Sequence, residues 1–287
     1  MRKCLLWLSM LVLACAPVLS VRGEITTYTK CGTHGTAKRL AGRTAVVSIF
    51  ASDTRWTWDN WGRDAYTYYD VYRRLGAGVR WISEQAASWG VQCEFVWDWL
   101  DPDNYDLYHE TAFPRRMLDG DTAYAGDWQY FIGYIDTLDN DAIMRRHSAE
   151  NILYMFYFNT VEPGKGWTGY AQPSYGEVAD NVGVYEYVVL PIGDNYPPGT
   201  YAHEILHLFG APDVYGPNAS WQFSQTFVDD FHRRWPREIM GGAPSYVYDR
   251  VNYDLSPLTA YYVGLTRSSE EQRRWNLRLS EYDLYGY

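Results

Sequence analysis

The sequence predicts an α+β fold, in which a twisted mixed β-sheet with covering helices is followed by a small C-terminal lobe that is mostly irregular or helical. Up to about residue 210, apolar runs of strand length alternate with segments of helical period, as expected for a sheet that helices cover. Beyond residue 211 the apolar runs are shorter. The chain has 287 residues, of which 47% are hydrophobic, enough for one large core.

The first strand is expected at residues 44–50, where β-branched and apolar side chains dominate. Residues 51–64 have no apolar period, so we expect a loop there. A helix follows, because apolar side chains recur at steps of three and four residues, at Tyr72, Leu75, Val79, Ile82 and Ala86. Gly76 and Gly78 lower the propensity of this helix without forbidding it, and Gly90 ends it.

The middle of the chain predicts two further strands and one helix. Residues 93–99 have the composition of a strand. Residues 100–127 are acidic and rich in turn residues, and two interpretations stay open: a solvated insertion, or a Ca²⁺ site built from hard carboxylate ligands. A helix that ends near His147 is expected next. The unbroken apolar run at residues 152–158 predicts a strand covered on both faces.

Two shorter strands, at residues 167–171 and 188–191, complete the predicted sheet. Residues 197–199, Pro-Pro-Gly, then interrupt the chain, and Thr200 is expected to cap the helix that follows. In the C-terminal lobe, Ser256-Pro257 is a typical helix start.

The helix expected after residues 197–199 contains the most informative stretch of the chain. Residues 203–213 read His-Glu-Ile-Leu-His-Leu-Phe-Gly-Ala-Pro-Asp. Residues four apart share one face of a helix, so His203 and His207 can direct two imidazoles at one metal ion. Glu204 lies beside the first histidine and can reach a water bound to that metal. Two imidazoles and one carboxylate, with a fourth position left to water, suit catalytic zinc.

The residues after the second histidine explain how a third ligand reaches the metal. Gly210 can take a positive φ and end the helix, and Pro212 cannot continue it. The chain therefore turns back, and Asp213 can approach the metal as the third ligand. A zinc-bound water loses its proton near neutral pH, and Glu204 is placed to accept that proton.

The pattern His-Glu-x-x-His-x-x-Gly-x-x-Asp resembles the motif of the metzincin zinc peptidases, and its continuation at residues 212–215, Pro-Asp-Val-Tyr, resembles the snapalysin and immune inhibitor A types. The resemblance implies zinc on His203, His207 and Asp213, with Glu204 as general base. It also implies a Met-turn beneath the metal, for which Met240 is the candidate.

The same resemblance implies an upper lobe at about residues 40–210, a lower lobe at about residues 211–287, and a zinc cleft between them. A protein or peptide substrate is expected to lie extended along the strand at residues 167–171, against Trp167, Gly169 and Tyr170. Tyr215 or Tyr246 is a candidate for stabilising the oxyanion.

Two alternatives to this interpretation stay open. Glu238 is a rival third ligand, because thermolysin-like zinc peptidases draw a glutamate from a later helix. A rival class is a catalytically inactive metzincin-fold protein that binds glycans or peptides with its aromatic side chains, which make up 17% of the chain. Glu204 argues against this class, since a metal site kept only for structure needs no general base.

Composition and the N-terminal segment predict where the protein acts. The formal net charge of −10 argues against a nucleic-acid partner. Residues 1–20 have a basic start and a short apolar core typical of an export signal. We therefore expect a secreted or periplasmic monomer with one catalytic domain at residues 21–287. Cys15 allows the alternative of a lipid anchor at the membrane, and Cys31 and Cys93 can either form a disulfide or stay free.

Overall fold

A computed structural model describes residues 37, 40–59, 65–118, 124–160, 169–172, 186–192, 196–216, 223–242 and 247–277. It describes the backbone alone for residues 65, 66, 124–128, 170 and 172. The expected export signal, Cys31, Trp167 and Tyr246 lie outside the described residues. Cys93 is buried, and Cys31, the other cysteine of the predicted mature chain, is among the residues not described, so whether the two form a disulfide stays open.

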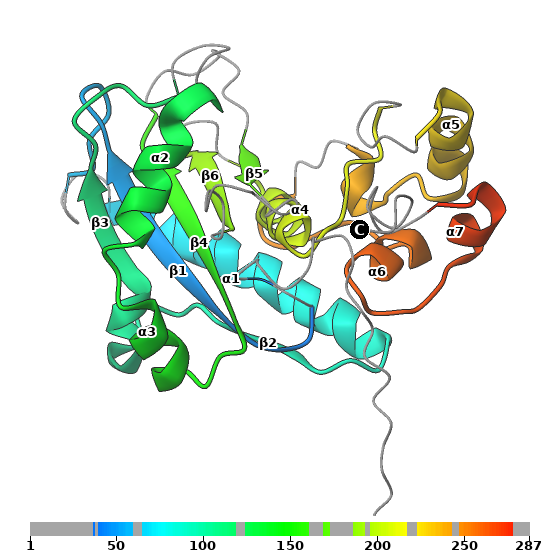
Figure 1. The fold of residues 1–287 in the computed structure, drawn as a ribbon, viewed down its shortest axis with the longest axis horizontal. Helices are drawn as coiled ribbons and strands as arrows, with labels where there is room; N and C mark the ends of the chain where they lie inside the picture. Colours follow the sequence, from blue (N-terminus) through cyan, green and yellow to red (C-terminus); the bar gives the residue numbers. More distant parts are fainter. Residues whose placement is uncertain are drawn as a thin grey trace, which may run out of the picture.

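Strands and helices alternate through the first two thirds of the chain, and helices alone follow (Figure 1). The elements in order are β1 (Gly42–Ser52), α1 (Ala65–Ser88), β2 (Cys93–Val96), η2 (Pro102–Leu107), β3 (Tyr108–Ala112), α2 (Tyr124–Ile135), α3 (Asn140–Arg146), β4 (Asn151–Phe158), β5 (Tyr170–Gln172), β6 (Tyr187–Pro191), α4 (Pro198–Leu208), α5 (Gln225–Arg234), η5 (Ile239–Gly241), α6 (Pro257–Tyr262) and α7 (Glu270–Trp275).

The strands form one mixed sheet, which confirms the predicted α+β architecture. Its order is β2-β1-β4-β6-β5, and β3 also pairs with β1. All pairs are parallel except β5, which runs antiparallel to β6 at the end of the sheet. β2 pairs with the first residues of β1 and β3 with the last ones, so these two short strands share the same edge of β1.

Helices cover both faces of the sheet, as the unbroken apolar run of β4 predicts. Successive side chains of a strand point to opposite faces. The Phe156 ring lies 4.7 Å from the ring of Phe131 on α2, whereas the Tyr157 ring lies 6.3 Å from the ring of Tyr201 on α4. All eight residues of β4 are buried. The strand is therefore apolar throughout because neither of its faces meets water.

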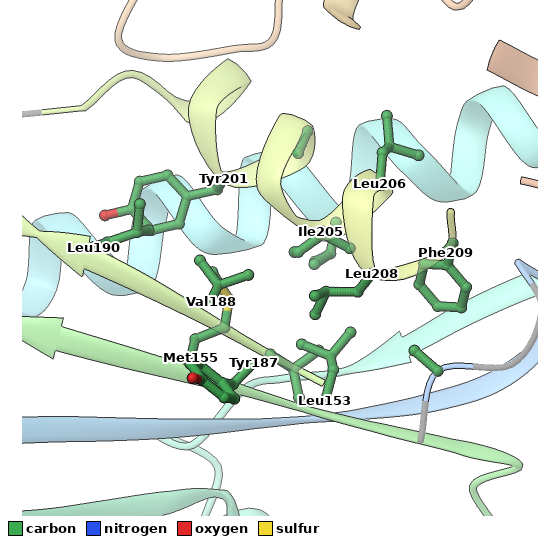
Figure 2. Packing of buried hydrophobic residues seen from close by; sticks show 14 of the residues in the cluster. Leu153, Met155, Tyr187, Val188, Leu190, Tyr201, Ile205, Leu206, Leu208 and Phe209 are labelled. Carbon is green, nitrogen blue, oxygen red and sulfur yellow. The ribbon is translucent and has the colours of Figure 1, made fainter. Parts of the chain in front are cut away.

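The helix α4 is fixed between the sheet, α1 and the C-terminal helices (Figure 1). Ile205 and Leu208 on its lower side meet Val188 and Leu153 of the sheet (Figure 2). On its other flank α4 approaches α1 closely at Gly78. A Cβ at that position would lie 3.1 Å from the carbonyl oxygen of Pro198 and 3.3 Å from the nitrogen of Ala202. The glycine that weakens α1 as a helix therefore makes room for α4.

Three local predictions were wrong. The acidic stretch at residues 100–127 is not only a solvated insertion, because it contains η2 and the strand β3. The single helix expected before His147 is two helices, since the Asp139 side chain caps a new one by accepting a hydrogen bond from the Ala142 amide at 3.0 Å. Thr200 does not cap α4, which begins at Pro198 with no side-chain cap.

The C-terminal part of the chain consists of short helices with side-chain caps. Ser224, Ser256 and Ser269 cap α5, α6 and α7, and Pro257 stands at the first turn of α6, as predicted. The buried side chains of these helices belong to the same hydrophobic cluster as those of the sheet. Among the described residues, no helix is long and apolar enough to cross a bilayer.

The contact between α1 and α4 makes a testable prediction about stability. Gly78→Leu should lower the free energy of unfolding by about 3 kcal/mol, because the new side chain meets the α4 backbone. The matched control is Gly133→Leu in α2, where an added Cβ meets nothing within 4 Å. That variant should gain about 0.5–1 kcal/mol from helix propensity. Urea denaturation followed by tryptophan fluorescence measures both, and equal effects would contradict the close packing of α1 and α4.

Candidate metal centre

Three side chains predicted as metal ligands converge at the C-terminal end of α4. The Nε2 atoms of His203 and His207 lie 3.1 Å apart. The Oδ1 atom of Asp213 lies 3.2 Å from the first and 3.3 Å from the second. Both imidazoles are largely buried, with 17% and 14% of their side chains exposed. Among the described residues, this is the one group of three metal-binding side chains whose ligand atoms cluster in this way.

Hydrogen bonds to backbone carbonyls fix the orientation of both imidazoles. The Nδ1 of His203 donates to the carbonyl oxygen of Ile239 at 2.9 Å, and the Nδ1 of His207 donates to that of Ala211 at 2.6 Å. A carbonyl oxygen only accepts, so the proton of each neutral imidazole is on Nδ1 and the Nε2 lone pair faces the cluster. Partners of this kind hold metal-binding histidines in their tautomer and orientation.

The cluster has the dimensions and the electronic character of a zinc site. Zinc–nitrogen bonds of about 2.0–2.1 Å in a tetrahedral arrangement place neighbouring ligand atoms roughly 3.3 Å apart, close to the separations observed. The two Nε2 lone pairs and a carboxylate oxygen repel one another unless a cation or a proton lies between them. The three residues therefore fit zinc.

The turn after α4 brings the third ligand back to the helix. Gly210 has a φ of +99°, the left-handed conformation that the sequence predicts. The amide of Ala211 donates to the carbonyl of Leu206 at 3.0 Å, which closes the helix end and directs the Ala211 carbonyl at His207. Because the helix stops here, Asp213 lies three residues further on beside both imidazoles.

The predicted Met-turn lies directly beside this turn. Met240 is fully buried in the short helix η5. Its carbonyl accepts a hydrogen bond from the amide of Val214 at 2.7 Å, and the carbonyl of the preceding Ile239 is the acceptor for His203. The backbone around Met240 thus contacts His203 on one side of the site and Val214, the residue after Asp213, on the other.

Glu204 faces from α4 toward the start of the edge strand β5. Its side chain is buried, and a Cβ at Gly169 would lie 3.6 Å from its Oε1 atom. Burial raises the pKa of Glu204, although His203 and His207 act in the opposite direction. The Gly169 amide donates to the hydroxyl of Tyr196 at 3.1 Å. The predicted base and the beginning of the predicted substrate strand are therefore neighbours.

The charges of the cluster shift the pKa values of its members in opposite directions. Burial lowers the pKa of His203, but the hydrogen bond with Asp213 and the charge of Glu204 outweigh it and raise the pKa to about 9. Burial raises the pKa of Asp213, but hydrogen bonds with the two histidines hold it well below its usual range. In the metal-free chain a proton on His203 therefore occupies the place of the cation.

Tyr215, the candidate for oxyanion stabilisation, lies at the exposed side of the cluster. More than half of its surface is exposed, 55%. Partial burial and a hydrogen bond to Asp213 raise its pKa. A Cβ at Gly242 would lie 2.7 Å from that of Tyr215, so the residue after η5 leaves room for this side chain. Of the other expected substrate contacts, Tyr170 has its backbone in β5 and Trp167 is not described.

Glu238, the rival third ligand, does not face the cluster. Its carboxylate accepts hydrogen bonds from the amide of Met240 at 2.5 Å and from the hydroxyl of Thr259 at 2.6 Å. Burial raises the pKa of Glu238 to about 7, although these hydrogen bonds lower it. Among the described residues, Asp213 and not Glu238 belongs to the group of three side chains that could hold a metal ion.

Within the described ranges, the other histidines and the acidic stretch supply no second group of three side chains that could hold a metal. His109 and His147 bond the carbonyl and the carboxylate of Asp106, and the Asp98 and Asp101 side chains accept backbone amides of their own turns. The Ca²⁺ site stays a prediction, since Asp119 and Asp121 are not described. Sequence reasoning missed the carbonyls that orient the histidines, because a backbone acceptor leaves no signal in side-chain identity.

Comparison with known proteins gives no relative for this chain. No protein-family model matches it, and no curated protein does.

The pKa shifts predict how the stability of the metal-free chain depends on pH. His203 has a folded pKa of about 9 against 6.5 unfolded, so its contribution is present below pH 6.5 and is lost as the pH rises through 9. The contribution of Glu238 to stability is also lost as the pH rises, because its pKa is 4.5 in the unfolded chain and about 7 in the folded one. The melting temperature without metal should therefore be lower at pH 9 than at pH 6.

Zinc should raise the melting temperature more at pH 9 than at pH 6, because fewer protons compete for the imidazoles at pH 9. Scanning calorimetry at both pH values, with and without zinc, measures this. A His203→Gln variant is the control, and its melting temperature should depend less on pH and not respond to zinc. A native chain that melts higher at pH 9 than at pH 6 without metal would contradict these assignments.

Proposed function

We propose that this chain is a zinc-dependent endopeptidase of the metzincin type, most similar in its motif to the snapalysin and immune inhibitor A types, and that it acts after export from the cell. The observation that carries the proposal is the arrangement of four side chains. Three candidate ligand atoms lie 3.1 to 3.3 Å from one another, and the buried carboxylate of Glu204 interacts electrostatically with them and lies beside Gly169 at the start of an edge strand.

His203, His207 and Asp213 would hold the zinc ion, with an open position for water. When bound there, zinc supplies a Lewis acid that polarises a carbonyl and lowers the pKa of water. Glu204 accepts the proton of the attacking water and passes it to the leaving amine. Its raised pKa suits this exchange, because a base with a pKa nearer neutrality both accepts and returns a proton readily.

The edge strand β5 is the proposed binding site for the substrate backbone. β5 is the last strand in the order of the sheet and pairs with β6. An extended peptide can add to such an edge through main-chain hydrogen bonds. Gly169, directly before β5, lies beside Glu204, so a peptide paired with this strand passes the proposed base. A mainly backbone-mediated contact of this kind favours unfolded or extended protein segments as substrates.

The role of Glu204 is tested by replacing its carboxylate with an amide. Glu204→Gln should bind one zinc per chain and lose at least about a hundredfold in the rate of casein hydrolysis, the scale of a lost general base. Metal analysis and a fluorescent casein assay on the purified full chain measure both quantities. Hydrolysis by Glu204→Gln at the native rate would exclude this role. Zinc in the native chain without any hydrolysis would favour the peptide- or glycan-binding alternative.

Asp213 is tested separately through metal content. Asp213→Ala should retain its fold and lose most of its zinc after dialysis against a mild chelator, because two imidazoles alone hold the ion weakly. Asp249→Ala is a suitable control, since this carboxylate is exposed and bonds only weakly with Arg250, at 3.6 Å. Circular dichroism checks the fold of both variants. Full zinc occupancy of Asp213→Ala would show that another residue is the third ligand.

A further inference from the structure

Glu238 is a fully buried carboxylate that the proposed reaction does not use. It precedes η5 and links this segment to the start of α6. One of its oxygens accepts from the Met240 amide. The other accepts from the amide and hydroxyl of Ser256, at 3.4 and 3.3 Å, and from the hydroxyl of Thr259 at 2.6 Å. The Met240 amide on one oxygen and the Ser256 amide on the other can only donate, so both carboxylate oxygens act as acceptors.

The segment that Glu238 fixes carries the acceptor for the first histidine. The Ile239 carbonyl lies between Glu238 and Met240 in the chain and accepts the Nδ1 proton of His203 at 2.9 Å. The Ile239 amide is itself held, since it donates to the carbonyl of Asp254 at 3.0 Å. Hydrogen bonds on two successive peptide units therefore fix this carbonyl. The Met240 amide, in the same peptide unit, donates to the Glu238 carboxylate, and the Ile239 amide, in the preceding unit, donates to Asp254.

We propose that Glu238 is a positioning residue for the metal centre: its carboxylate holds the Ile239 carbonyl where it keeps the His203 imidazole oriented, with Nε2 toward the zinc. The inference rests on the proposed zinc site. In this role Glu238 influences metal affinity although it is not a ligand. Changing the hydrogen-bond partner of a metal-binding histidine typically changes metal affinity about 10–100-fold. Glu238 acts one step further out, through the backbone.

The conservative variant Glu238→Gln separates this role from packing. Glutamine has nearly the same volume, but its amide group donates where a carboxylate oxygen accepts. In either orientation the amide nitrogen faces a backbone N–H that cannot accept a hydrogen bond, that of Met240 or that of Ser256. The peptide unit of Ile239 then shifts while the buried volume is kept.

The matched control is Glu271→Gln in α7. This carboxylate is also buried, and it accepts from Arg234 and from the indole of Trp235 at 3.2 and 3.1 Å. It lies in the same lobe, and its described hydrogen bonds do not involve η5 or the metal ligands. The control therefore loses a buried carboxylate of similar kind and reports the effect of general destabilisation.

The experiment measures zinc dissociation constants of the full native chain and both variants by competition with a chelator, and the visible spectrum of Co²⁺ in each. We expect zinc affinity to fall about tenfold in Glu238→Gln, with a shifted or weaker Co²⁺ band, and to stay native in Glu271→Gln. Native affinity and spectrum in Glu238→Gln, or equal losses in both variants, would overturn the inference.

If Glu238→Gln does not fold, Thr259→Val removes the hydroxyl that bonds the carboxylate at 2.6 Å and keeps the side-chain volume. We expect about threefold weaker zinc binding in this variant, and unchanged affinity would overturn the inference. A native chain that binds no zinc would overturn the proposed function together with this role. Native binding with an unaffected Glu238→Gln would overturn the positioning role alone.

Discussion

Three hydrogen-bond acceptors face one another at the centre of this structure, and the rest of the site depends on holding them there. Unless a proton or a cation lies between them, two imidazole nitrogens and a carboxylate repel at separations of 3.1 to 3.3 Å. The backbone carbonyls of Ile239 and Ala211 oppose that repulsion by fixing each ring from its far side. An arrangement held in this way would need little reorganisation to bind a cation.

The scaffold explains why such an unfavourable cluster persists. The helix α4 is packed against the sheet (Figure 2) and against α1, so its two histidines have little freedom to rotate away. Asp213, the proposed third ligand, follows the helix end at Gly210, and the carbonyl for His203 comes from η5 in the C-terminal part of the chain. The cluster is therefore assembled from one rigid helix, one turn and one backbone segment that Glu238 fixes.

The sequence predicts best those parts of the fold in which burial leaves a periodic pattern. β1, α1, β4 and α4 are recovered because their apolar residues mark the faces that pack. β3 was missed because its residues, Tyr-His-Glu-Thr-Ala, are half exposed and show no apolar alternation, so its pairing with β1 is decided by tertiary structure. In the site, spacing alone identified the residues of the cluster. It left Glu238 open as an alternative ligand, because its partners Ser256 and Thr259 are near only in space.

All three proposed ligands come from a single stretch of eleven residues, 203–213, and this has a consequence for chain entropy. Closing a short loop removes little conformational freedom from the unfolded chain, and each doubling of loop length changes that term by only about 0.6 kcal/mol. A metal bound here would therefore cross-link only residues that are already close in the sequence. It does not join distant parts of the polypeptide, and the association of the C-terminal helices with the sheet depends on apolar packing and on the contacts of η5.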